Sequence, residues 1–181
     1  MRRLVAKDES ALRELMAEYG DELTRTAYLL VKDRQTAEEA VMDAFVQAYA
    51  KIGQLKQPDK LRSWLLRIVA NRCRMRMRTW SWRSLLPFER IESLAEGAEP
   101  GPEELLLARW RGERLSEAIH RLDYKYREVI ALYYFNELSV SEIAEQLGSN
   151  ENTVKARLSR GRARLRALLE KGDEDGAGVY E

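Results

Sequence analysis

The chain between Ser139 and Leu165 has the pattern of two helices joined by one tight turn. Ser139 and Glu142 have the spacing of a capping box, which begins a helix. Gly148 stands where a helix needs a left-handed exit, and Asn150 is suited to cap the helix that follows. This combination fixes the geometry of a helix pair more tightly than any other segment, and it predicts a helix-turn-helix.

Three positions give this pair the spacing of a DNA-binding helix-turn-helix. Ala144 lets the helices approach, Gly148 permits the turn, and Val154 fills the point where the helices cross. At 100° per residue, the second helix turns bases and small residues away from its apolar stripe. Such a face enters a major groove, where bases on the helix contact guanine edges or phosphates. The predicted base-edge residues are Lys155, Ser159 and Arg160, and Thr153 and Arg157 complete the predicted DNA-binding set.

The charges of the chain are separated along its length, although 31 basic and 30 acidic side chains leave a net charge of only +1. Residues 61–88 hold seven arginines and no acid, and residues 155–171 hold seven bases and one acid. Between these basic blocks, residues 89–104 hold six glutamates and one arginine, together with clustered glycine and proline. Because local field selects charged partners, both basic blocks are candidates for nucleic-acid binding, and the segment between them is predicted to be a flexible acidic linker.

Helical periodicity runs through the first half of the chain as well. An apolar stripe begins at Leu12 and reaches Leu30, with an interruption expected at Gly20. Thr36 and Glu39 have capping-box spacing before a second helix, and a third helix follows Pro58. No useful length of strand-like alternation occurs. We therefore predict an all-α protein with two helical domains, the second containing the helix-turn-helix. The expected ranges are 1–86 and 111–171 for the domains, 87–110 for the flexible acidic linker, and 172–181 for a disordered tail.

The first basic block is predicted to form a ridge on the third helix. Arg67, Asn71, Arg74 and Arg78 follow steps of four, three and four residues on the side away from the apolar stripe. Phosphates neutralised by such a ridge release counterions, so binding would be strongly salt-dependent. The preceding loop carries Gln54 and Lys56, among other polar residues, and their side chains are suited to contact an unstacked base.

The second helix has the opposite character, because residues 35–50 contain acids and no base. Its outward side mixes acidic with apolar residues, which is more typical of a protein contact than of a face in plain solvent. An ordinary solvated face remains the alternative at this point. The residues concerned are Glu38, Glu39, Met42, Asp43 and Val46.

Several chemistries are disfavoured by what the chain contains. The lone Cys73 excludes an internal disulfide, and the lone His120 gives no zinc set, so we expect no metal and no other cofactor. Cys73 is expected to be an inert small side chain, although arginines beside it leave redox sensing open. There is no Gly-rich phosphate loop and no nucleophile elbow, which argues against an enzyme. No apolar run is long enough for a membrane span, and we expect a cytoplasmic protein without direct membrane insertion.

Three segments in order resemble the bacterial RNA polymerase sigma factors of the extracytoplasmic-function (ECF) type, a two-domain branch of the sigma-70 family. YGDELTRTAYLLVKDRQTAEEAVMDAFVQAY, residues 19–49, is similar to the helices of the family's domain two. LRSWLLRIVANRCRMRMR, residues 61–78, is similar to its promoter-melting segment. LDYKYREVIALYYFNELSVSEIAEQLGSNENTVKARLSRGRARLR, residues 122–166, is similar to domain four.

The resemblance implies a role for each surface. The face from Glu38 to Phe45 would dock on the β′ clamp of core RNA polymerase, and the second domain would meet the β flap. The loop with Gln54 and Lys56, together with the arginine helix, would capture a flipped base and phosphates of the melted −10 element of promoter DNA. The helix from Asn150 onward would read the −35 element. Members of the family are commonly held by an anti-sigma factor, which we therefore expect as a further partner.

The chain departs from the family's usual pattern at three positions. Met42 stands where a glutamine is frequent, Asp123 where a proline follows the leucine, and Asn152 where a glycine is frequent. Met42 bears on the clamp contact, and Asn152 bears on the start of the reading helix.

A conventional repressor or activator is the alternative from another class. It would use the same helix-turn-helix to bind an operator as a dimer, without polymerase as an obligate partner. That alternative accounts only for the last third of the chain, because it leaves the arginine helix and the acidic helix without a role. The sequence also offers no evident coiled-coil seam for dimerisation.

Overall fold

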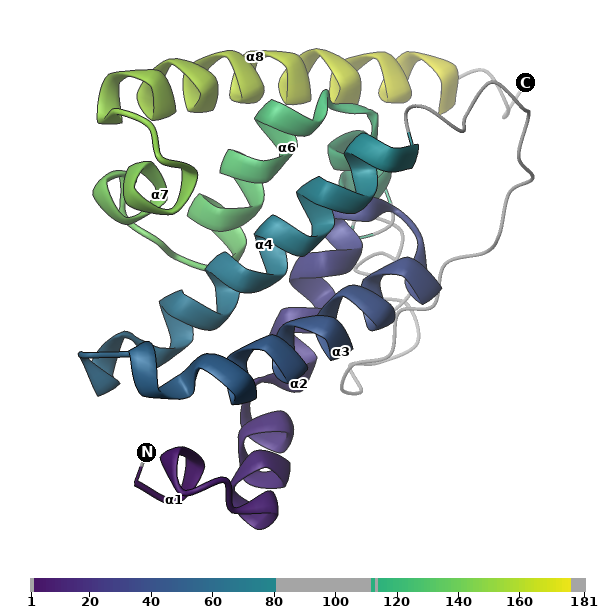
Figure 1. Ribbon diagram of the computed structural model, residues 1–181. Helices are drawn as coiled ribbons and strands as arrows, with labels where there is room; N and C mark the ends of the chain where they lie inside the picture. Colours follow the sequence, from purple (N-terminus) through teal and green to yellow (C-terminus); the bar gives the residue numbers. More distant parts are fainter. Residues whose placement is uncertain (1, 81–111, 113, 177–181) are drawn as a thin grey trace, which may run out of the picture.

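The computed structural model describes the backbone of residues 2–80, 112 and 114–176. Side chains are described for residues 2–78, 112 and 114–170. These residues form helices and turns, with no strand among them (Figure 1). The elements are α1 (Arg2–Val5), α2 (Glu9–Val31), α3 (Arg34–Lys51), the 3-10 turns η1 (Ile52–Gln54) and η2 (Pro58–Lys60), α4 (Leu61–Trp80), α6 (Tyr124–Ile130), the π-helix η3 (Ala131–Phe135), α7 (Val140–Leu147) and α8 (Glu151–Gly176). Residues 114–121 are helical as well.

Helices α2, α3 and α4 pack together into an N-terminal unit, which we define as residues 2–80 (Figure 1). The helices approach closely because small residues line the inner face of α3, where Ala37, Ala40, Ala44 and Ala48 are fully buried. Large aliphatic side chains from the neighbouring helices fill the space that these alanines leave. They include Leu23 and Leu30 of α2 and Leu65, Leu66 and Val69 of α4, all at most 1% exposed.

Helix α2 runs without interruption through Gly20, so the break that the sequence predicted at this glycine is wrong. Leu15, Leu23 and Ala27 continue one buried stripe on both sides of the glycine. Burial of that stripe outweighs the roughly 1 kcal/mol that a glycine costs inside a helix. The helix instead ends at Lys32, which takes a left-handed conformation with φ 67°.

The start of α3 also differs from the expected capping box. Its cap is Asp33, whose carboxylate accepts a hydrogen bond of 2.7 Å from the backbone N–H of Thr36. Glu39 does not bond back to a cap, because its carboxylate is held by Gln35 and Arg76. Asp33 lies three residues before Thr36 and caps the N–H of Thr36 itself, so the helix begins about one turn sooner than Thr36 predicted.

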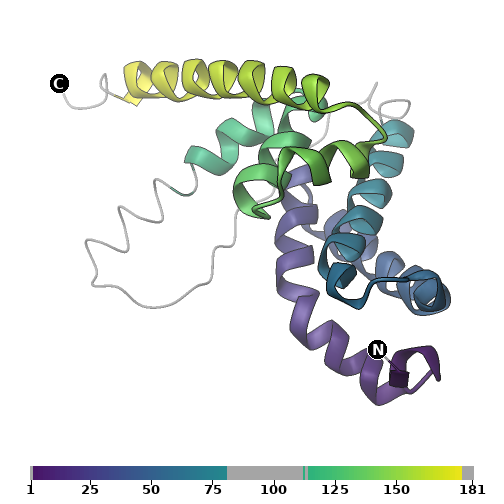
Figure 2. The same ribbon diagram turned by 90° about the vertical axis from the view of Figure 1, so that its left-hand side faces the viewer.

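The C-terminal unit, defined as residues 114–176, is built from α6, α7 and α8 with the π-helix η3 between the first two (Figure 2). Helix α8 crosses over α6 and α7 and spans the top of the molecule. Gly161 lies at the crossing of α8 with α6, where an added Cβ would sit 3.2 Å from Cγ1 of Ile130. The glycine therefore sets how closely the two helices pack.

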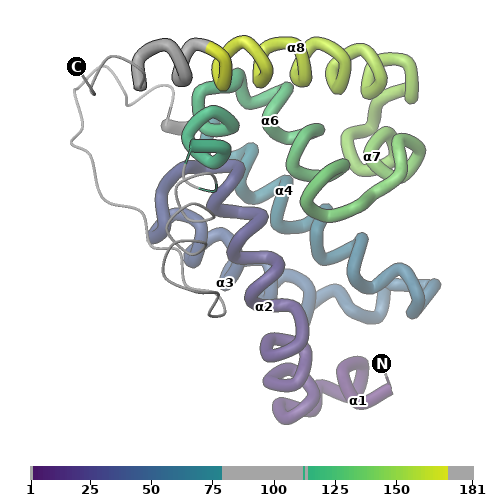
Figure 3. The backbone as a smooth tube through the Cα atoms, turned by 180° about the vertical axis from the view of Figure 1, so that it is seen from behind, coloured from purple at the N-terminus to yellow at the C-terminus, as the bar shows by residue number. Residues whose placement is uncertain are grey.

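The two units contact each other through α2 and α4 on one side and α6 and η3 on the other (Figures 1 and 3). Their buried apolar residues belong to a single cluster. The predicted linker 87–110 lies outside the described residues. The predicted tail begins at Gly172, whereas α8 continues to Gly176, and residues 177–181 are not described.

Candidate nucleic-acid and protein interfaces

The turn between α7 and α8 has the capping that the sequence predicted. The Ser139 side chain accepts from the backbone N–H of Glu142 while the Glu142 carboxylate accepts from the backbone N–H of Ser139, which completes the capping box. Gly148 has φ 57°, and Asn150 accepts a 2.8 Å bond from the backbone N–H of Thr153. These contacts satisfy backbone groups at both helix ends and so hold α8 at a defined angle to α7.

The outer face of α8 presents the predicted base-edge residues to solvent. Val154 and Leu158 are buried against the rest of the C-terminal unit, and this burial turns Lys155, Ser159 and Arg160 outward. Lys155 pairs with Glu151 at 3.4 Å, an exposed contact that is easily exchanged for a phosphate. Thr153 and Arg157 are half-buried at the edge of the face. Lys155, Ser159 and Arg160 are therefore exposed on one capped helix, and Thr153 and Arg157 border its buried stripe.

The predicted loop residues Gln54 and Lys56 lie on the surface. Gln54 is the last residue of η1 and Lys56 follows in the turn to η2, which leads into the start of α4, and both are exposed. The turn is fixed from below by Ile52, which is 1% exposed in the core. The buried Ile52 fixes the backbone of this loop, and the side chains of Gln54 and Lys56 extend from it into solvent, where they can contact a ligand.

The ridge on α4 is also on the surface, but its members differ in their surroundings. Asn71 and Arg78 are exposed, and Arg67 is half-buried. The Arg74 side chain is 33% exposed and is held on two sides. Its guanidinium donates to Oδ1 of Asn71 at 2.8 Å and to Oε1 of Glu128 on α6 at 2.7 Å. The structure thus brings the four residues together, with one of them occupied by the C-terminal unit.

Glu128 is a site residue that the sequence did not reveal. Its side chain is 4% exposed, and burial raises the pKa of its carboxyl group above the usual value while Arg74 opposes that shift. A glutamate in a short helical segment has no sequence signal for burial, since its partner lies 54 residues away. The ion pair with Arg74 is visible only in three dimensions.

The acidic and apolar face of α3 is exposed as predicted. Met42 and Val46 are 54% and 65% exposed, which is high for such side chains, and Glu38, Glu39 and Asp43 surround them. Glu38 pairs with Arg34 at 2.8 Å on the same helix. Exposed aliphatic side chains beside acids are typical of a surface that binds a protein.

Arg76 of α4 changes the charge of this face in a way that the helix pattern did not predict. Its guanidinium contacts Glu39 at 2.6 Å and Asp43 at 3.0 Å. The hydrogen bond from Arg76 is the main cause that lowers the pKa of Glu39. Arg76 therefore bridges the two carboxylates and adds a positive charge to the face of α3, although residues 35–50 themselves contain no base.

Cys73 lies in the core of the N-terminal unit and is fully buried. Burial raises the pKa of its thiol to about 12, in spite of the arginines on either side. The thiolate that redox chemistry needs is thus strongly disfavoured. The environment of Cys73 supports the expectation that its side chain is inert.

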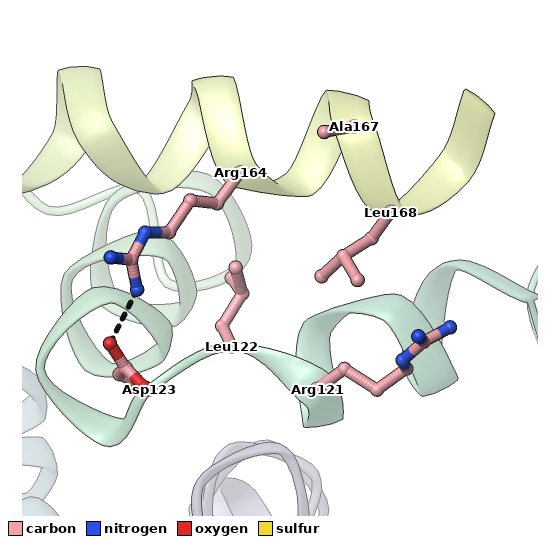
Figure 4. Close-up of a pocket in the computed structure, with 6 residues that line it drawn as sticks. All are labelled: Arg121, Leu122, Asp123, Arg164, Ala167 and Leu168. Carbon is pink, nitrogen blue, oxygen red and sulfur yellow. Dashed lines mark hydrogen bonds and ion pairs between the residues drawn. The ribbon is translucent and has the colours of Figure 1, made fainter. Parts of the chain in front are cut away.

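An open pocket of about 280 Å³ lies between α8 and the segment that enters α6 (Figure 4). Leu122, Ala167 and Leu168 form its apolar floor, and an ion pair between Arg164 and Asp123 borders it. Among the described residues, no group of His, Cys, Asp and Glu side chains is arranged to hold a metal ion. None of the described helices combines the length and apolar character that crossing a bilayer requires.

A helix-turn-helix with an exposed basic second helix, joined in one chain to another exposed basic helix, indicates a DNA-binding protein. Comparison with known families makes this more specific. The family described as Sigma-70 region 2 matches residues 15–83, and the family described as Sigma-70, region 4 matches residues 112–165. With these two matches and a curated ECF relative that is 30% identical over 90% of its length, the chain belongs to the ECF sigma factors of RNA polymerase.

Curated relatives cover nearly the whole chain. The ECF RNA polymerase sigma factor SigW of Bacillus subtilis is 30% identical, over 90% of this chain and 90% of its own length. The RNA polymerase sigma factor CnrH of Cupriavidus metallidurans is 29% identical, over 92% and 91%. SigV of Bacillus subtilis is 28% identical, over 87% and 90%.

Two solved structures have the same arrangement of helices. One is the sigma factor RpoE in complex with the anti-sigma factor NepR from Bartonella quintana, with 28% identity and a TM-score of 0.69, covering 87% of this chain and 96% of that one. The other is CnrH in complex with the cytosolic domain of CnrY, with 27% identity and a TM-score of 0.67, covering 94% of each chain.

Proposed function

We propose that this sigma factor recognises a promoter through two separate surfaces and binds core RNA polymerase through a third. In this assignment α8 reads the −35 element in the major groove. Lys155, Ser159 and Arg160 contact base edges, while Thr153 and Arg157 contact the backbone beside them. The observation that carries the proposal is the exposure of Lys155, Ser159 and Arg160 on a reading helix whose N-terminus is capped by Asn150, in a chain that also exposes the α4 ridge.

The −10 element is assigned to the loop before α4 and to the ridge on α4. Gln54 and Lys56 receive an unstacked base, and Arg67, Asn71, Arg74 and Arg78 hold the phosphates of the melted strand. Support comes from the exposed loop above a buried Ile52 and from the match of residues 15–83 to Sigma-70 region 2. The charge of the ridge predicts that this contact weakens steeply as salt rises.

Core polymerase is assigned to the face of α3. Glu38, Glu39, Met42, Asp43 and Val46 form the contact with the β′ clamp, and the C-terminal unit contacts the β flap. The paired exposure of Met42 and Val46 supports this assignment, because a partner would remove that apolar surface from water. Functional domains of 1–86 and 111–171 follow, and the two family matches, 15–83 and 112–165, fall inside these ranges.

An anti-sigma factor is proposed as the partner that restrains the protein. Two structures similar to this chain are sigma factors in complex with the anti-sigma factor NepR and with the cytosolic domain of CnrY. The protein is proposed to act in the cytoplasm, where polymerase and DNA are found, and to act as an initiation factor with no catalytic residues and no cofactor of its own.

Transcription in vitro tests the proposed function against the repressor alternative. Sigma-free core polymerase is mixed with this protein and with genomic fragments, and the start sites of the transcripts are mapped. We expect initiation at defined start sites that are absent when the protein is omitted. DNA binding by the protein without any start site that depends on it would instead favour the repressor.

A further inference from the structure

Asn136 anchors the C-terminal unit to the N-terminal unit. This residue follows the π-helix η3 and is fully buried. Its side-chain amide donates to Oγ1 of Thr26 at 2.8 Å and to Oε1 of Glu22 at 3.0 Å, both on α2. Arg62 of α4 pairs with Glu22 and donates to the backbone carbonyl of Asn136 at 3.0 Å. One residue of the C-terminal unit therefore joins two helices of the N-terminal unit.

The ion pair of Glu128 and Arg74 is a second bond between the units. Glu128 carries a carboxylate on α6, and its counter-ion is supplied by α4 at 2.7 Å. The geometry is that of a charge-assisted hydrogen bond between a guanidinium and an anionic oxygen, which a DNA phosphate would also form. Glu128 therefore occupies the same group that the proposed function assigns to the melted strand.

The interface between the units also holds features that oppose it. Three buried polar atoms have no hydrogen-bond partner among the described residues, and all three belong to the C-terminal unit: Nε of Arg127, Oδ1 of Asn136 and Oε1 of Gln146. Gln146 nevertheless donates through its amide to the carbonyl of Ser63 on α4, at 3.1 Å. Lys32 at the end of α2 is exposed, and its pKa is lowered by partial burial and by repulsion from Arg127.

Polar atoms without a hydrogen-bond partner are unfavourable when they are shielded from water. Separation of the units would allow water to reach such atoms at the interface. The contact between the units therefore combines a few specific hydrogen bonds with an unfavourable desolvation free energy. This combination is suited to an interface that opens. The chain between Trp80 and Gly112 has 31 intervening residues and so has a covalent reach of about 100 Å.

We propose that the free protein holds itself closed, with the carboxylate of Glu128 standing in for a DNA phosphate on Arg74 and with Asn136 as the anchor. This proposal rests on the proposed function, because it assumes that Arg74 binds a phosphate of the melted strand. Closure and strand binding at Arg74 exclude each other. The apparent affinity for single-stranded DNA is then reduced by the fraction of molecules that are open, and any partner that separates the units raises it.

Glu128→Gln tests the proposal, with Asp123→Asn as its matched control. Both replace a carboxylate by an amide and raise the net charge by one, but Asp123 pairs with Arg164 inside the C-terminal unit, away from the interface. Asn136→Ala removes the anchor without changing charge. Each full-length variant is measured by small-angle X-ray scattering and by fluorescence anisotropy with a short labelled single-stranded oligonucleotide of mixed sequence, after circular dichroism has verified its helix content.

We expect Glu128→Gln and Asn136→Ala to increase the radius of gyration and to raise the affinity for the oligonucleotide about threefold or more, while Asp123→Asn changes neither beyond its charge. Adding Arg74→Ala to Glu128→Gln should abolish the gain in affinity. Equal scattering and equal affinity of Glu128→Gln and Asp123→Asn would overturn the closed state. If wild-type protein still directs transcription in that case, the proposed function stands, and only the closed state is lost.

Discussion

His120 shows how the surroundings of one side chain set its charge. The ring is half-buried between the units, edge-on to Tyr28 with ring centroids 5.2 Å apart, and its Nε2 lies 3.3 Å from the backbone carbonyl of Tyr28. Burial, together with repulsion from Arg127 and Lys32, lowers the pKa of His120 to about 4. The imidazole is therefore neutral at physiological pH and serves as a donor to α2.

The stability of the protein should fall as pH decreases from about 6.5 to about 4. Within this window the unfolded chain takes up a proton on His120 and the folded chain does not, so protonation favours unfolding. His120→Gln keeps a side-chain donor without the titration and should flatten this part of the curve. Urea unfolding at pH 7 and at pH 5 measures the difference. An equal loss of stability in the variant and in wild type would assign the effect to other groups.

Arg160 is the residue whose loss should most directly change promoter choice. Arg160→Ala is expected to weaken recognition of the upstream element by about 1–3 kcal/mol if the guanidinium forms a bidentate contact with a base. Competition between mapped promoters and their upstream-element variants in transcription reactions measures this effect. Arg166→Ala is the control, because Arg166 is exposed farther along the same helix. An unchanged preference for Arg160→Ala would remove this residue from the reading face.

Two glycines inside helices differ in whether another helix packs against them. Gly20 is in α2 with open space where a Cβ would be, whereas Gly161 of α8 is against Ile130 and Tyr126 of α6. Both glycines are inside helices, and helix propensity alone favours alanine at both positions. Packing distinguishes the two positions.

Gly20→Ala should stabilise the protein by about 0.5–1 kcal/mol, because alanine removes backbone freedom from the unfolded chain. Gly161→Ala should instead destabilise it by about 1 kcal/mol, because the added methyl group would meet buried side chains that cannot move far. The midpoints of thermal unfolding of the two variants measure the difference. Equal gains in both variants would show that α8 and α6 separate at little cost.

The face of α3 should behave as one element when its charge is reversed. Glu39→Lys combined with Asp43→Lys is expected to lower the affinity for core polymerase at least tenfold, because the new bases also repel Arg76. DNA binding by α8 should be unaffected. Glu117→Lys, an exposed reversal outside α3, is the control, and polymerase affinity is measured by competition with a labelled sigma factor. Unchanged affinity of the double variant would place the clamp surface elsewhere.

At the scale of the whole molecule, the two units share one buried apolar cluster and the polar contacts of Asn136. The units should therefore unfold together. Asn136→Ala leaves Thr26 and Glu22 without their amide donor and should weaken the coupling by about 1–3 kcal/mol. Circular dichroism on heating is expected to show one transition for wild type and two for the variant. A single transition in the variant at the wild-type temperature would show that Asn136 does not couple the units.

Much of this architecture followed from local patterns in the sequence. The capping box at Ser139, the left-handed exit at Gly148 and the cap at Asn150 are short-range contacts, so residue type and spacing determine them. The apolar stripes likewise determined which faces of α4 and α8 are buried. They therefore also determined that the α4 ridge and the base-edge residues of α8 lie on the surface.

Tertiary structure alone decided which polar side chains bind one another. The partners of Arg74, Arg76 and Asn136 are 54, 37 and 114 residues away along the chain, and no periodic pattern relates charges at such separations. It also decided that α2 passes through Gly20, since burial of a long stripe outweighed a local preference. A sequence pattern specifies the direction in which a side chain leaves its helix. The group that it meets depends on how separate helices pack together.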